Sequence, residues 1–184
     1  MKNELLELLN STKEEYDRCC EASRNDVMRG LKPYEQAPVT GKLHTDAARA
    51  RVEETARTAR QKAVELLNGE IEKAQLAIAA APSTDALNTV SLLSITKSKD
   101  VRDYEAAYKA YGSNPQVANA LGKIARDNDV NFFVSAPEYD RLEDLQLFRK
   151  TVEKALDPFN VANGKLSSGY IAAIGMDMEN AGIE

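Results

Sequence analysis

Residues 45–81, TDAARARVEETARTARQKAVELLNGEIEKAQLAIAAA, form the stretch from which the fold can be predicted. The stretch contains no proline, and its only glycine is Gly69. Small and aliphatic side chains recur every three or four residues, which is the spacing of one face of an α-helix. This apolar stripe consists of Val52, Ala56, Ala59, Ala63, Leu67, Ile71, Ala74 and Ile78. We therefore predict one helix of about ten turns, roughly 55 Å long at ~1.5 Å per residue.

The apolar stripe indicates that this helix needs a partner along much of its length. Its spacing fits a heptad as far as Ala63 and then shifts by four residues, a stutter that relaxes a supercoil. Alanine lets helices approach closely but buries little area. A first helix, predicted from Lys2 to about Arg29, is too short to cover the whole stripe. The rest is left for another element or another chain, and we interpret the stripe as an association interface.

The remaining signals predict short elements. Gly30 is a helix stop, and residues 31–43 form a loop. Pro82 ends the long helix, and shorter helices follow, with helix caps at residues 83–85 and at Asn114-Pro115 and a stop at Gly112. The apolar run 130–134 resembles a strand, and Asn163-Gly164 within 159–168 signals a hairpin turn. We predict a mainly α fold, with an extended helical hairpin or coiled-coil-like pair over 1–81 and a compact helical domain over 82–184, which includes a short strand pair.

Composition narrows the class of protein. Of the 184 residues 43% are hydrophobic, only 6% are aromatic and none is Trp, so we expect an aliphatic, alanine-rich core. The net charge is −5, and residues 127–184 carry eleven acidic against five basic side chains. An acidic C-terminal third disfavours wrapping around nucleic acid. The N-terminus lacks a signal-peptide pattern, and no apolar run is long enough for a membrane span, so we expect a soluble, cytoplasmic protein.

Few residues suggest catalysis or a cofactor. His44 is the only histidine and lies in a predicted loop or helix cap, so we expect neither a Ser-His-Asp set around it nor a metal site, which would need further His or Cys ligands at the right spacing. Cys19 and Cys20 are adjacent, and neighbours on a helix point ~100° apart, so we expect small buried thiols rather than a disulfide. Phosphate-binding glycine motifs are absent from the sequence. We predict a protein that is not an enzyme and binds no cofactor or metal.

One basic cluster opens an alternative function. Arg49, Arg51, Arg57 and Arg60, with Lys62, could contact phosphates of a nucleic acid. Acidic residues Asp46, Glu53 and Glu54 are interspersed among them, which is typical of an exposed, ion-paired helix face. Three hypotheses therefore stay open: a structural protein that associates through helices, a nucleic-acid-binding or regulatory module, and an enzyme with an unrecognised carboxylate site.

The layout of the chain resembles a known group of proteins. A leucine- and glutamate-rich opening (MKNELLELLN), a long Ala/Arg/Glu helix and a small C-terminal part look like small helical virion proteins of tailed bacteriophages. This resemblance lies in layout and composition over the whole chain rather than in a motif. It implies a role in building or decorating a particle, with symmetric copies of the chain and with protein partners, after synthesis in the cytoplasm.

Overall fold

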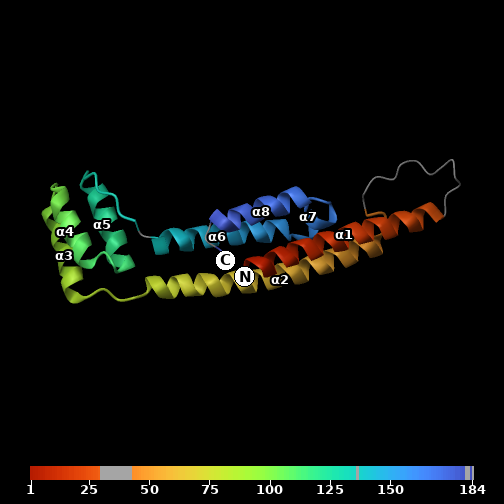
Figure 1. Cartoon of the computed structure of the whole chain (residues 1–184), viewed down its shortest axis with the longest axis horizontal. Helices are drawn as coiled ribbons and strands as arrows, with labels where there is room; N and C mark the ends of the chain where they lie inside the picture. Colours follow the sequence, from red (N-terminus) through yellow and green to blue (C-terminus); the bar gives the residue numbers. More distant parts are fainter. Residues whose placement is uncertain (30–42, 136, 181–182, 184) are drawn as a thin grey trace. The chain divides into compact units, whose positions relative to one another are not determined.

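The computed structural model describes residues 1–29, 43–135, 137–180 and 183. Within these ranges the regular structure consists of eight α-helices and no strand. The helices are α1 (Lys2–Arg29), α2 (Asp46–Ile78), α3 (Thr84–Thr96), α4 (Val101–Tyr111), α5 (Pro115–Asp127), α6 (Pro137–Ala155), α7 (Pro158–Ala162) and α8 (Ser168–Asn180), shown in Figure 1. The predicted stop at Gly30 and nearly all of the predicted loop 31–43 lie outside the described residues.

The two long helices follow the sequence pattern closely. α2 has 33 residues and α1 has 28, and they pack as a pair against further helices. Several predicted helix ends are also confirmed. The Ser83 side chain caps α3 by accepting a hydrogen bond from the backbone N–H of Ala86. The Asn114 side chain caps α5, which has Pro115 in its first turn. Gly112 is the C-cap of α4.

The predicted strands are wrong. Residues 130–134 form no strand, because among the described residues no other segment pairs with them. Phe132 instead packs its ring on Tyr104 and Tyr108, with centroids 5.7 and 6.1 Å apart. Residues 159–168 form α7 and the turn before α8. Gly164 has a positive φ of 72°, so Asn163-Gly164 does make a turn, but it joins two helices rather than two strands.

The chain forms two compact units, which we describe separately. The first consists of residues 1–69 and 145–184, and the second of residues 70–144. The predicted division at residue 81 differs from this grouping, because α7 and α8 pack against α1. A C-terminal segment thus returns to the N-terminal helices.

The first unit has an aliphatic core between α1, α2, α6 and α8, whose ribbons lie side by side in Figure 1. Its fully buried side chains come from all four helices: Leu5, Leu9, Val52, Leu67, Leu145, Val152, Ile174 and Met178. These residues recur at helical spacing on one face of each helix, so burial of that face stabilises the arrangement.

The second unit contains a smaller core between α3, α4 and α5. Tyr104 is its largest fully buried side chain, surrounded by Ala86, Leu93, Ala107, Val117, Leu121, Ala125 and Val130. The Tyr104 hydroxyl donates to the carbonyl of Ser98 (2.9 Å) and accepts from the Asn128 amide (2.8 Å), so this buried polar group is satisfied. Gln116 and Asn114 also hydrogen-bond to carbonyls of Ile78 and Ala80, which ties the start of α5 to the end of α2 and the link that follows it.

Candidate functional site

The apolar stripe of α2 lies mostly inside the chain's own packing. Val52, Ala56, Ala63 and Leu67 have no exposed surface, and Ala59, Ile71 and Ala74 are at most 8% exposed. Only Ile78, at the end of α2, is partly exposed. The side chains proposed from sequence as an association interface are therefore core residues of the described chain, and an association surface has to be sought on other helix faces.

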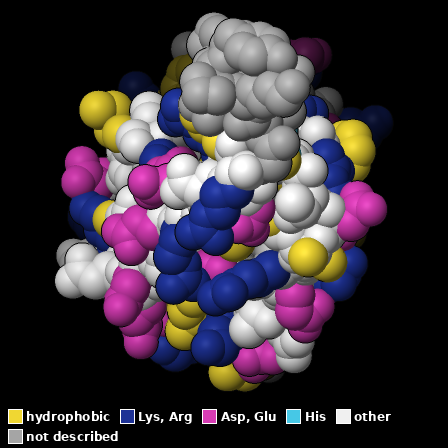
Figure 2. Space-filling view, turned by 90° about the vertical axis from the view of Figure 1, so that its right-hand side faces the viewer, with side chains coloured by type: hydrophobic (Ala, Val, Ile, Leu, Met, Phe, Trp, Pro, Cys, Tyr) yellow, Lys and Arg dark blue, Asp and Glu magenta, His cyan; other side chains and the backbone are white. Residues whose placement is uncertain are grey.

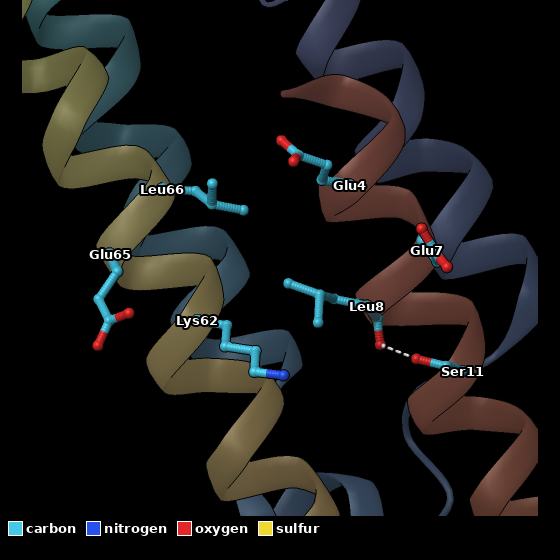
Figure 3. A pocket seen from close by; sticks show the side chains of 7 residues that line it. All are labelled: Glu4, Glu7, Leu8, Ser11, Lys62, Glu65 and Leu66. Carbon is cyan, nitrogen blue, oxygen red and sulfur yellow. Dashed lines mark hydrogen bonds between the residues drawn. The ribbon is translucent and has the colours of Figure 1, made fainter.

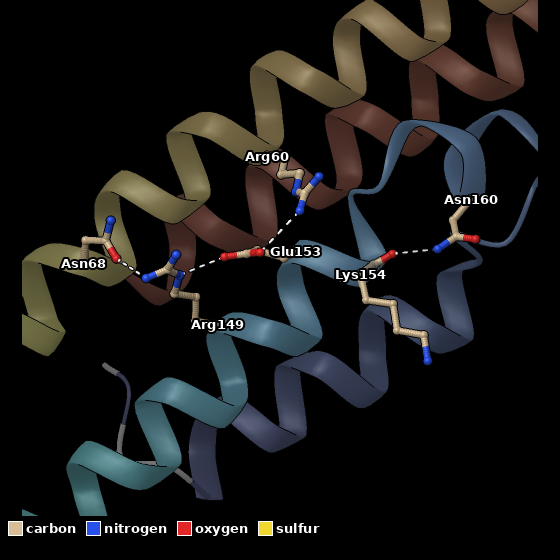
Figure 4. Close-up of polar contacts among 6 residues, drawn as sticks. All are labelled: Arg60, Asn68, Arg149, Glu153, Lys154 and Asn160. Atoms are coloured by element: carbon tan, nitrogen blue, oxygen red, sulfur yellow. Dashed lines mark hydrogen bonds and ion pairs between the residues drawn. The ribbon is translucent and has the colours of Figure 1, made fainter.

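Polar side chains join α2 to α6. Figure 4 shows the polar contacts along this seam. Glu153 of α6 accepts from Arg149 Nε (2.7 Å) and from Arg60 of α2 (3.2 Å), while Arg149 donates to Asn68 Oδ1 (2.8 Å). The hydrogen bond from Arg149, with that from Arg60, holds the pKa of Glu153 below its usual value. The seam is thus fixed by charge as well as by aliphatic packing.

The basic cluster of α2 is neutralised by neighbouring carboxylates. Arg51 pairs with Glu15 of α1 (2.6 Å), and Arg60 pairs with Glu153. Arg57 pairs with Glu54 (3.0 Å) and Glu53 (3.6 Å), and Arg49 lies 4.0 Å from Glu53. Figure 2 shows acidic side chains interspersed with Lys and Arg on the face it displays. Phosphate binding by these arginines would have to displace existing carboxylate partners, which weakens the nucleic-acid alternative.

The polar groups of α1 near Glu15 interact with one another and with Arg51 of α2. Burial alone would raise the pKa of Glu15, but hydrogen bonds from Cys19 and Arg18, with the charges of Arg18 and Arg51, hold it below its usual value. Burial and the hydrogen bond to Glu15 raise the pKa of Cys19, and burial is the main reason that the pKa of Tyr16 rises to about 12. Cys19 and Cys20 are free and buried, as expected from sequence. A thiol with a raised pKa is a poor nucleophile at neutral pH.

A cleft of about 510 Å³ lies between α1 and α2 (Figure 3). Leu8 and Leu66 point into it from opposite sides, and Lys62 reaches across from α2. Three carboxylates, Glu4, Glu7 and Glu65, complete the lining together with Ser11. The lining therefore combines two leucines with three carboxylates and one lysine, which suits an apolar side chain with a basic neighbour better than an anion.

The outer face of α3 was not identified from the sequence. Leu87, Leu92 and Ile95 are 51%, 61% and 79% exposed and lie on the side of α3 away from the core residues Ala86 and Leu93. We call these three residues the α3 outer face. Asp85 in the first turn is the only charged residue of the whole helix. Exposed Asn88 and Ser91 lie among the three residues of this face. Solvent-facing helix surfaces normally carry charges, so an uncharged face that exposes three large aliphatic side chains is typical of a surface that binds protein.

A groove of about 610 Å³ between α3 and α4 adjoins this face. Its lining is largely small or apolar: Thr89, Leu92, Leu93, Thr96, Ser98, Asp103, Ala106, Ala107, Ala110 and Tyr111. The only carboxylate in that lining, Asp103, accepts a hydrogen bond from Ser98 (2.5 Å). In the sequence, the alanines of α4 are the only sign of this groove. They predict a groove only once α3 is known to lie beside α4.

Other residue combinations give little support for chemistry. In the described ranges, no group of three His, Cys, Asp or Glu side chains is arranged to hold a metal ion. His44 is exposed, and its backbone N–H donates to Ser23 (3.2 Å). None of the described helices is both long and apolar enough to span a bilayer. Comparison with protein-family models, curated proteins and solved structures finds no match.

Proposed function

We propose that this chain is a non-enzymatic structural or assembly protein that associates with other protein chains through exposed helix faces. The observation that carries the proposal is the α3 outer face, where three large aliphatic side chains meet solvent on a helix with one charge. Exposed aliphatic residues scattered singly need no explanation, but three on one face of one helix, beside a small-residue groove, favour a protein interface.

The proposal extends to a role in a bacteriophage virion, which rests on the layout resemblance described above. Virion components are built from repeated copies, and such copies need helix faces that are complementary to one another. The interface in this proposal lies on outer helix faces rather than on the α2 stripe from Val52 to Ile78, because the chain itself buries that stripe.

The alternative function, nucleic-acid binding through Arg49 to Lys62, is supported by the number of basic residues on that part of α2. The ion pairs of those arginines with Glu15, Glu53, Glu54 and Glu153 favour a structural role instead. Retention on immobilised DNA that falls steeply with salt would favour this alternative.

Light-scattering mass determination on the purified chain tests the proposal. We expect a mass that rises with concentration toward a whole multiple of 20.2 kDa. A monomer at every concentration, which also binds none of the protein in a lysate of its host, would overturn the association function.

A further inference from the structure

We propose that the occupant of the α3 outer face is a second copy of this chain, bound through the same face and the adjoining α3–α4 groove. This inference rests on the proposed function and specifies the surface and the partner. A twofold dimer uses the same patch on both subunits, so the patch must be complementary to itself in shape and in charge.

The shape of the patch meets that requirement. Leu92 lines the groove, and Ile95, three residues further along α3, is exposed on the same side, so the two form one i, i+3 row at the edge of the groove. Such a row is a ridge on the helix surface, and helices pack by placing ridges into grooves. The groove beside the ridge has Ala106 and Ala110 on its α4 side, which leave room for a larger side chain. Each copy therefore offers both a ridge and a groove.

The charge distribution also favours a second copy. In a twofold contact the patch meets an identical patch, so a patch with an excess of one sign of charge repels its own copy. α3 carries no Lys or Arg and has its one carboxylate, Asp85, in the first turn. The α4 side of the groove contributes Asp103, which is hydrogen-bonded to Ser98. A partner that recognised the chain by opposite charge would find little to bind on this face, whereas an identical uncharged face meets no repulsion.

The size of the patch sets the expected strength. A stable interface covers about 800 Å² on each partner, and a helix of 13 residues, at ~1.5 Å per residue, is only about 20 Å long. The α3 outer face alone is smaller than such an interface, so the contact must also include the α3–α4 groove. We therefore expect a dimer that dissociates on dilution rather than a permanent one.

Sedimentation velocity of the full chain, over a series of concentrations, tests this inference. Leu92→Glu and Ile95→Glu place a charge on the face, while both positions are exposed enough to keep the fold, which circular dichroism verifies. Leu147→Glu is the matched control, because Leu147 is 64% exposed on α6, in the first unit. We expect the dimer dissociation constant to rise at least about tenfold for each α3 variant and to change less than about twofold for the control.

The outcomes separate this inference from the function on which it rests. If the unmodified chain associates but the α3 variants associate equally well, or if only Leu147→Glu weakens association, the α3 pairing is wrong and association through another face stands. If the unmodified chain stays monomeric at every concentration, the second-copy inference fails, and the function survives only as binding to a different protein.

Discussion

At the scale of single residues, we expect substitution by alanine to have opposite effects on stability at Gly69 and at Gly112. Gly69 lies inside α2 with no heavy atom within 4 Å of an added Cβ, so alanine gains helix propensity without a clash. A Cβ on Gly112 would clash with the ring of Tyr108 and would lie 2.5 Å from the carbonyl oxygen of the same residue. Chemical denaturation should show Gly69→Ala stabilising by about 0.5–1 kcal/mol and Gly112→Ala destabilising by about 1–3 kcal/mol. Two changes of the same sign would contradict this packing.

A second pair of residues tests the buried polar network of the second unit. Tyr104→Phe keeps the ring but removes the hydroxyl that accepts from Asn128, which leaves a buried amide without this partner. We expect a loss of about 1–3 kcal/mol in the free energy of unfolding. Tyr108→Phe is the control, because the Tyr108 hydroxyl makes only a long, exposed hydrogen bond to Ser135 (3.3 Å) and should cost less than about 0.5 kcal/mol. Equal losses of unfolding free energy in the two variants would show that the hydrogen bond between the Tyr104 hydroxyl and Asn128 does not stabilise the second unit.

At the scale of secondary structure, the helix α2 and its apolar face could be predicted from the sequence, but the partner of that face could not. Its helix and its inward stripe follow from a period of 3.6 residues, which is a local property of the chain. The identity of its partner is not local: Glu153 reaches Arg60 across 93 residues of sequence, and no spacing in the chain encodes that approach. For this reason the stripe could be recognised as apolar but not assigned to the chain's own core.

The same distinction explains the error at residues 130–134. β-branched and aromatic residues favour a strand, but a strand also needs a neighbour to pair with. Phe132 finds aromatic partners in Tyr104 and Tyr108, which lie on a helix. The α3 outer face was missed for a related reason, since Leu87 and Leu92 look like core residues until the packing shows which side of α3 is covered.

The burial of the α2 stripe predicts a severe effect at its centre. Ala63→Glu would place a carboxylate where the side chain has no exposed surface, and we expect a loss of about 3–5 kcal/mol in unfolding free energy. Thr58→Glu is the control on the exposed side of the same helix, with an expected change within about 0.5 kcal/mol. Thermal unfolding monitored by circular dichroism measures both. A stable, folded Ala63→Glu protein would mean that the stripe is not part of the core.

At the scale of the whole molecule, acid should weaken the seam between α2 and α6. The pKa of Glu153 is lowered in the folded chain, so its contribution is present above the unfolded pKa, about 4.3, and is lost as the pH falls through the folded value. Glu153→Gln should cost about 1 kcal/mol near neutral pH, because the three side chains remain partly exposed. Urea unfolding should show this difference vanishing in acid.

The matching control is Glu143→Gln, which removes an exposed carboxylate from the same helix. We expect its unfolding free energy to follow that of the unmodified chain at every pH. A Glu153→Gln penalty that persists unchanged below the folded pKa would show that the ionised carboxylate is not what stabilises the seam.

For the whole molecule, we propose that the chain builds its own core from the α2 stripe and associates through the α3 outer face. Native mass spectrometry, which counts chains directly, tests it on the unmodified protein beside Ile95→Glu. We expect a population at twice the chain mass of 20.2 kDa for the unmodified protein, and a predominantly monomeric, folded Ile95→Glu variant. A dimer population equally strong in both proteins, or absent from the unmodified protein, would contradict it.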